Sequence, residues 1–171
     1  MRLFIAINFG PAVRERLLAL RDGLRGKSSA GNFSEPDNLH LTLVFIGECD
    51  AAQTARVRSA MDAADFEPFP AVIARVGRFG RRGGDIWWAG VRESKPLLAL
   101  QRELTERLLR DGFAVDAGDY HPHITLGREV VTGEKPWETE PFGETVSAID
   151  LMKSERIRGK LTYTAIHTVS K

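Results

Sequence analysis

Cysteine is almost absent from this chain, since Cys49 is the only one among 171 residues. A single cysteine cannot form an internal disulfide bond, which is typical of proteins in a reducing compartment. Cys49 also has no adjacent histidine that could activate its thiol, so we expect it to be structural. These observations predict a cytoplasmic protein.

The chain also lacks a strong charge of one sign and a long apolar run. Its formal net charge is +1, which disfavours binding to long duplexes through phosphate neutralisation. Recognition of a nucleic-acid end or of a small nucleotide stays open. No segment approaches the roughly 20 apolar residues that span a membrane. The apolar opening, residues 1–10, lacks the basic region and cleavage site of a signal peptide, so we expect a strand there.

What the chain does contain is the tripeptide H-x-T, twice. His40-Leu41-Thr42 and His123-Ile124-Thr125 each open an apolar run. In a β-strand, residues i and i+2 point to the same face, so each motif places an imidazole beside a hydroxyl. We predict that the two motifs face each other around one small site. For either motif alone, the competing interpretation is an ordinary strand with a buried, hydrogen-bonded histidine.

This pair of motifs suits acid–base chemistry at a phosphate without a metal. The ordinary pKa of histidine, about 6.5, lets the ring give and take protons near neutral pH. Displacement at phosphorus needs a base on the attacking oxygen and an acid on the leaving oxygen, and these oxygens lie on opposite sides. Histidines on two opposing strands meet that need. The hydroxyls of Thr42 and Thr125 could donate to the non-bridging oxygens as charge builds there.

The remaining pattern predicts an antiparallel α+β fold. Apolar residues at strand or helix spacing, together with turn and capping residues, define the elements. We expect strands over 2–8, 39–46, 71–79, 85–92, 123–130, 142–153 and 161–169, helices over about 11–26, 50–64 and 94–111, and loops over 26–32 and 132–141. The chain is 43% hydrophobic and can bury one sizeable core. We therefore predict one domain, residues 1–171, with two lobes that carry one motif each.

A metal centre is the competing hypothesis for the second motif. His121 and His123 offer two imidazoles, and Asp116 and Asp119 lie nearby in a polar loop. Carboxylates and cysteines at a recognisable zinc spacing are missing, so we expect no metal. The chain also lacks the G-x-S-x-G elbow of serine hydrolases and a glycine-rich phosphate loop.

The sequence resembles the two-histidine phosphoesterase superfamily, and within it the bacterial and archaeal RNA 2′,3′-cyclic phosphodiesterases, also called 2′-5′ RNA ligases. The segments that carry the resemblance are FIAINF, PDNLHLTLVFIGE, YHPHITLGR and the tail LMKSERIRGKLTYTAIHTV. They span most of the chain in the family's order. The resemblance implies a bilobal α+β fold of two antiparallel sheets, related by a pseudo-two-fold duplication, that line a central cleft with helices outside.

The resemblance also implies hydrolysis of a terminal 2′,3′-cyclic phosphate to a 2′-phosphomonoester, with no cofactor or metal. It makes His40 the proton donor and His123 the proton acceptor, although reversing the reaction exchanges these roles. Joining of RNA by a 2′-5′ bond, hydrolysis of a small cyclic nucleotide, and non-catalytic binding of RNA ends are the alternatives. We expect a monomer without a protein or membrane partner, whose substrate is an RNA end or a small cyclic nucleotide.

Further substrate contacts depend on details of the strands that carry them. Arg128 matches an arginine that often follows the family's second motif, but strict alternation turns it away from His123 unless the strand bulges near Gly127. Four aromatic rings could stack on a base, with core packing as the competing interpretation for each: Phe4, Phe33, Trp88 and Tyr163. The arginine series Arg75, Arg78, Arg81 and Arg82 is either a solvated hairpin or a guide for RNA. We expect His121 to act from a loop and His167 to be structural.

Overall fold

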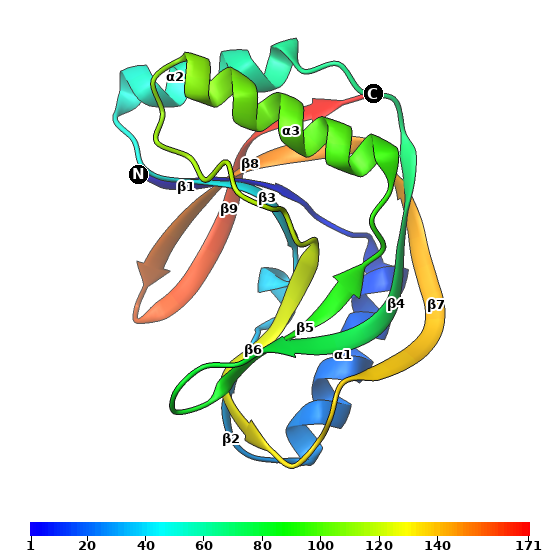
Figure 1. Cartoon of the computed structure of the whole chain (residues 1–171). Coiled ribbons are helices and arrows are strands. Elements are labelled where there is room, and N and C mark those ends of the chain that lie inside the picture. The colour runs from blue at the N-terminus through cyan, green and yellow to red at the C-terminus, as the bar shows by residue number, and fades with distance from the viewer.

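Two antiparallel β-sheets carry the two H-x-T motifs, one in each sheet (Figure 1). The computed structural model describes all of residues 1–171. The four-stranded sheet has the order β3 (Leu41–Glu48), β1 (Arg2–Ile7), β8 (Ala148–Ile157) and β9 (Lys160–Ser170). The five-stranded sheet has the order β2 (Ser28–Phe33), β6 (His123–Thr132), β5 (Asp85–Val91), β4 (Phe69–Phe79) and β7 (Trp137–Val146). The prediction of an α+β fold built on two antiparallel sheets is confirmed.

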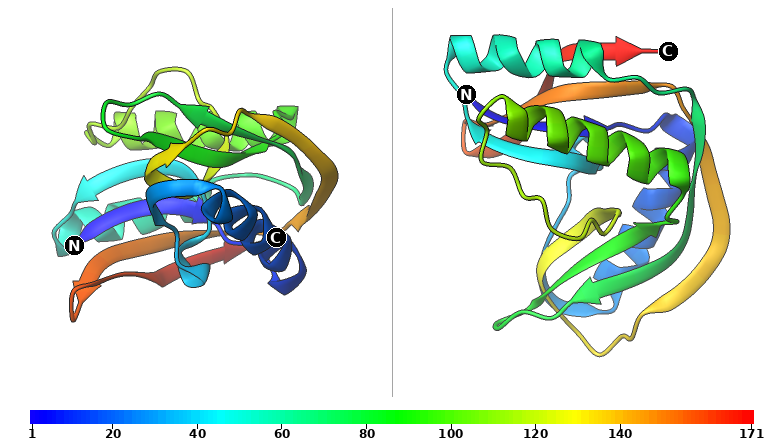
Figure 2. Two further views of the ribbon diagram at one scale, coloured as in Figure 1. Left: turned by 90° about the horizontal axis from the view of Figure 1, so that it is seen from below. Right: turned by 45° about the horizontal axis from the view of Figure 1, so that its top comes forward.

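Three helices cover the sheets, as Figures 1 and 2 show. Helix α1 (Pro11–Gly26) packs on β2, β6 and β7, whereas α2 (Ala51–Ala63) and α3 (Lys95–Arg110) pack together beside β3 and β9. The predicted starts of α2 and α3 are confirmed: Asp50 and Gln53 form a reciprocal capping box, and the Ser94 hydroxyl accepts from the Leu97 amide. No helix has the length and apolar character needed to cross a membrane.

Strand β1 is buried on both faces and therefore has no polar alternation. Leu3 and Ile5 belong to the main core. Phe4 and Ala6 point the other way and form a small apolar cluster with Met152 of β8, against which Tyr163 of β9 packs. Because residues alternate across a strand, β1 joins the core on one side to the base of the pocket described below on the other.

Most of the predicted loop 26–32 and much of the predicted loop 132–141 belong to strands. Residues 28–33, SSAGNF, form β2 at the edge of the five-stranded sheet. Small polar side chains and glycine have low strand propensity, so only backbone pairing with β6 reveals this strand. The predicted strand 142–153 is also wrong, since β7 begins at Trp137 and β8 begins at Ala148 in the other sheet. Pro141 is tolerated because β7 is an edge strand, and the chain crosses between the sheets at Ser147.

The two motif strands occupy different positions in their sheets. Strand β3 lies at an edge and pairs only with β1, whereas β6 is interior and pairs with β2 and β5. The likeness between the two lobes is therefore loose. His40 precedes the first residue of β3, so the loop before that strand controls its position, whereas His123 is the first residue of β6.

Candidate functional site

Both motifs line one pocket of about 680 Å³ between the two sheets. His40 and Thr42 come from the β3 side, and His123 and Thr125 come from β6. The pocket also contains four further residues that the sequence suggested for substrate binding: Phe4, Phe33, Arg128 and Tyr163. Residues that are far apart in the chain thus surround one space large enough for a nucleotide.

The ring of His40 is held at both nitrogens. Its Nδ1 lies 2.8 Å from the carbonyl oxygen of Asn38, and its Nε2 lies 2.9 Å from the Thr42 hydroxyl. A carbonyl oxygen only accepts hydrogen bonds, so Nδ1 carries the proton and donates a hydrogen bond to the Asn38 carbonyl. In the neutral ring, Nε2 then accepts from the Thr42 hydroxyl. The backbone carbonyl two residues upstream, in the 3₁₀ turn Pro36–Asn38, therefore sets the tautomer.

His123 repeats this arrangement at the second motif. Its Nδ1 lies 2.5 Å from the carbonyl oxygen of His121, again two residues upstream. Nδ1 donates there as well, which leaves Nε2 of the neutral ring free to accept a proton. Unlike the Thr42 hydroxyl, the Thr125 hydroxyl has no hydrogen-bond partner within the protein, so it is available to a ligand.

The environment of the two rings favours their neutral forms. Burial lowers the pKa of His40, and the positive charges of Arg128 and His123 lower it further, against the opposing effect of the Asn38 carbonyl. Burial likewise lowers the pKa of His123, with Arg128 and His121 adding to the effect. The charge of His123 affects the pKa of His40, and the charge of Arg128 affects the pKa of both histidines. The three side chains therefore lie within electrostatic reach of one another.

Arg128 reaches the pocket through a β-bulge. Strand β6 has one residue more than the facing segment of β5 between Thr125 and Gly127. It has one more again between Gly127 and Val130, where the register with β2 also shifts. Glu129 has φ of 54°, in the left-handed region that non-glycine residues rarely adopt. The first of these bulges reverses the alternation between Thr125 and Arg128, so the Arg128 side chain lies on the same side as His123 and Thr125, which is the condition that the alternation argument set.

Aromatic rings surround the His40 side of the pocket. The Phe4 and Tyr163 rings lie 4.8 and 5.1 Å from the His40 ring, centroid to centroid, and they contact each other edge-on at 5.0 Å. Phe33 lines the pocket from the β2 side. Phe4 is buried, whereas Phe33 and Tyr163 are partly exposed. Phe4 therefore supports the His40 ring, and Phe33 and Tyr163 offer surface to a ligand.

Sequence reasoning missed three further cations that line the pocket: Arg2, Arg156 and Lys160. With Arg128 they face a single pocket carboxylate, that of Glu35, so the pocket is positively charged. They come from β1, from β8 and from the start of β9, far from either motif, and only the tertiary fold brings them together. The exposed ring of Phe45 also lines the pocket, beneath the Arg2 guanidinium at 4.9 Å.

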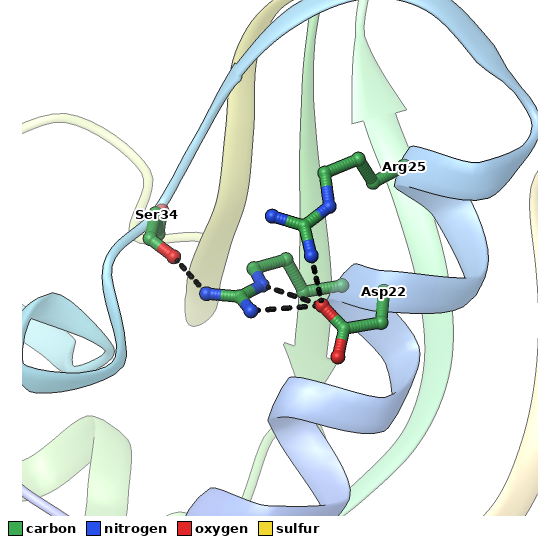
Figure 3. A network of polar contacts seen from close by, with 4 residues as sticks. Asp22, Arg25 and Ser34 are labelled. Carbon is green, nitrogen blue, oxygen red and sulfur yellow. Dashed lines mark hydrogen bonds and ion pairs between the residues drawn. The ribbon is translucent and has the colours of Figure 1, made fainter.

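Helix α1 supports the pocket through Ser34. The Arg21 guanidinium donates to the Ser34 carbonyl at 2.8 Å and to the carboxylate of Asp22, which also accepts from Arg25 (Figure 3). The Ser34 hydroxyl donates in turn to the Thr125 carbonyl at 2.8 Å. The segment between β2 and β3 is thereby held against the second motif.

The other candidates lie outside this pocket. His167 pairs with Asp62 of α2 at 2.7 Å. His121 contributes its carbonyl to His123, and its side chain is exposed. Cys49 is buried. No group of three or more His, Cys, Asp or Glu side chains is placed to hold a metal ion. Trp88 and Arg75 lie in an adjoining groove, on the far side of His123.

Comparison with known proteins identifies the family. The profile of the 2′-5′ RNA ligase superfamily matches residues 9–158. The RNA 2′,3′-cyclic phosphodiesterase of Archaeoglobus fulgidus is 34% identical, with 84% of this chain and 85% of the relative covered. That of Escherichia coli K12 is 31% identical over 96% of this chain and 93% of the relative.

Solved structures agree with this result. The crystal structure of E. coli LigT in complex with 3′-AMP has a TM-score of 0.87 and 26% identity, and the match covers 99% of this chain and 97% of that one. A crystal structure from Thermus thermophilus has the same TM-score at 25% identity and the same coverage. Because the family profile covers most of the chain, from α1 to the end of β8, the chain belongs to the 2′-5′ RNA ligase superfamily.

Proposed function

We propose that this protein hydrolyses the 2′,3′-cyclic phosphate at an RNA end to a 2′-phosphomonoester, and that residues 1–171 form the domain that does so. The observation that carries the proposal is the shared pocket, where one imidazole from each sheet lies within electrostatic reach of the other and of Arg128. The relatives named RNA 2′,3′-cyclic phosphodiesterase support the choice of reaction.

His123 is the general base in this proposal. Its Nδ1–H is committed to the His121 carbonyl, so the neutral ring presents an unprotonated Nε2. Burial and Arg128 lower its pKa, which keeps the ring neutral at physiological pH. His123 takes a proton from water as the water oxygen attacks phosphorus. General bases of this kind contribute typically 10²–10⁴-fold to the rate.

His40 is the general acid. As water attacks, the bond between phosphorus and the 3′ oxygen breaks on the opposite side, and the leaving oxygen takes the proton from Nε2 of His40. The ring must be protonated at that moment, although burial lowers its pKa. The negative charge of the bound phosphate opposes this effect, because a nearby opposite charge favours the protonated form. The 2′ oxygen stays bonded to phosphorus, which gives the 2′-phosphomonoester.

Charge that builds on the non-bridging oxygens is stabilised by Arg128 and by the hydroxyls of Thr125 and Thr42. A charged guanidinium and fixed hydroxyl donors act strongly where a bound substrate displaces water. Phe33 and Tyr163 provide stacking surfaces for the terminal base. Acid, base and positive charge all come from side chains, so we propose that the reaction needs neither a metal nor a cofactor.

The direct test is incubation of an RNA oligonucleotide ending in a 2′,3′-cyclic phosphate, in excess EDTA, with product identification by ³¹P NMR. The proposal expects a 2′-phosphomonoester. A 3′-phosphomonoester would reverse the assignment of the leaving oxygen, and loss of activity with EDTA would favour metal-dependent chemistry. Tight binding without any product would favour a module that only binds RNA ends.

A further inference from the structure

A second groove of about 800 Å³ adjoins the catalytic pocket and shares His123 with it. It runs across the five-stranded sheet, over residues of β6, β5, β4 and β7. Residues that oppose each other in the strand pairs share a face of the sheet. His123 lies opposite Gly90, which lies opposite Arg75, which lies opposite Glu138. The sheet face that presents the catalytic imidazole therefore continues directly into this groove.

The floor of the groove is an aromatic platform made possible by glycine. The Trp88 ring lies over Gly77, where a Cβ atom would come within 2.4 Å of the indole, and Gly90 leaves room at 3.1 Å. The Phe79 ring contacts both Trp88, at 5.3 Å, and His123, at 5.1 Å between centroids. The Trp88 ring itself is buried, so it supports the Phe79 ring, which is partly exposed beside His123.

Two arginines that have no hydrogen-bond or ion-pair partner for their guanidinium groups border this platform. The Arg75 guanidinium lies 5.1 Å from the Trp88 ring centroid, and Arg92 lines the groove nearby. Neither forms a side-chain hydrogen bond or ion pair, whereas Arg78 on the opposite face of the same strand pairs with Asp85 at 3.8 Å. The groove also contains the carboxylates of Glu93 and Glu138. The charges in the groove therefore balance. We expect stacking to contribute more to the binding of a ligand there than long-range electrostatic attraction does.

We propose that this groove binds the nucleotide on the 5′ side of the cyclic-phosphate nucleotide, so that the enzyme prefers an RNA strand to a mononucleotide. The inference rests on the proposed function, because the cyclic phosphate must lie between His40 and His123. The terminal base then occupies the pocket with Phe33 and Tyr163. The penultimate base stacks on the partly exposed Phe79 ring, which Trp88 supports from below, and Arg75 contacts the phosphate that joins the two nucleotides.

The physical argument is that every base offers a flat face, so stacking on aromatic rings selects for a strand without selecting a sequence. An arginine can both stack on an aromatic ring and donate hydrogen bonds to phosphate. Arg75 already lies over the Trp88 ring. Because the groove is balanced in charge, the preference for a strand should depend weakly on salt.

The test compares two substrates, cytidine 2′,3′-cyclic phosphate and a dinucleotide that ends in the same cyclic phosphate. Wild-type protein should show a kcat/KM about tenfold higher for the dinucleotide, the scale expected for one stacked base. Arg75→Ala should lower the dinucleotide value about fivefold and change the mononucleotide value less than twofold. Arg78→Ala, on the same strand and the opposite face, should leave the ratio unchanged.

Equal losses on both substrates with Arg75→Ala, or no preference in the wild type, would overturn the inference. If the wild type hydrolyses neither substrate, the proposed function fails instead, and calorimetry with the 2′-phosphorylated mononucleotide and dinucleotide still tests the groove. About tenfold tighter binding of the dinucleotide, reduced in Arg75→Ala, would support the groove, and equal affinities would contradict it.

Discussion

The phenol of Tyr120 donates a hydrogen bond to the backbone carbonyl of Thr42 at 2.7 Å. Tyr120 lies three residues before His123, so the segment that leads into the second motif is tied directly to the first. Burial raises the pKa of Tyr120 well above its usual range, so the phenol stays protonated and remains a donor throughout the working pH range. This contact helps to fix the position of one motif strand relative to the other.

Tyr120→Phe therefore keeps the aromatic ring and removes the hydrogen bond to the Thr42 carbonyl. We expect a loss of about 1 kcal/mol in the free energy of unfolding. We also expect a roughly tenfold fall in kcat with little change in KM, because small displacements of catalytic groups are costly. Thr168→Val, which removes a hydrogen bond to Asp150 away from the pocket, is the control and should leave kcat unchanged. A destabilised Tyr120→Phe with full kcat would show that the contact is only structural.

Arg128→Met removes a positive charge that lowers the pKa values of His40, His123 and Tyr163. A positive neighbour disfavours the imidazolium, so its removal raises the pKa of both histidines. We expect the acidic limb of the pH–rate profile to move to higher pH and kcat/KM to fall about 10²-fold. NMR titration of the histidine ring protons measures the pKa change, with Arg82→Met on the hairpin as control. Unchanged histidine pKa values would contradict the proximity of Arg128.

Thr125→Val tests the hydroxyl that has no protein partner. Because no internal hydrogen bond is lost, the free energy of unfolding, measured by heat or denaturant, should change by less than about 0.5 kcal/mol. Catalysis should fall about 10²-fold, since a donor to the developing negative charge is gone. Thr42→Val additionally removes the bond to His40 and should alter the His40 titration. A Thr125→Val variant with wild-type kcat would remove Thr125 from the proposed mechanism.

The lowered histidine pKa values also predict how stability depends on pH. Below the ordinary pKa of about 6.5, the unfolded chain binds protons at these histidines that the folded chain resists binding. The free energy of unfolding should therefore decrease as pH falls from about 6.5, until the folded state is protonated too. Urea unfolding at a series of pH values measures this slope. The double variant His40→Gln, His123→Gln should show a flatter dependence between about pH 7 and 5.5, and an identical slope would contradict the pKa directions.

The two motifs were readable from the sequence because their chemistry and their strand periodicity coincide. His40 and Thr42 share a face for the same reason that His123 and Thr125 do, and that reason is local. The helix starts at Asp50 and Ser94 were readable as well, because caps are also local.

Other features depend on tertiary structure and were hidden. The second of the two bulges around Arg128 places Glu129 at positive φ without a glycine to mark it. Strand β2 consists of small polar residues that form a strand only because β6 lies beside them. The cations Arg2, Arg156 and Lys160 meet in the pocket only because β1, β8 and β9 are neighbours in one sheet.

The central claim, that His40 and His123 act on opposite sides of one phosphorus, is tested most directly by the pH dependence of kcat/KM on a cyclic-phosphate RNA end in EDTA. The wild type should give a bell-shaped profile. His123→Ala should lose the acidic limb and His40→Ala the alkaline limb, each with a rate reduced by about 10²–10⁴-fold and the fold retained. Wild-type activity in either folded variant, or a bell shape that survives both substitutions, would contradict the claim.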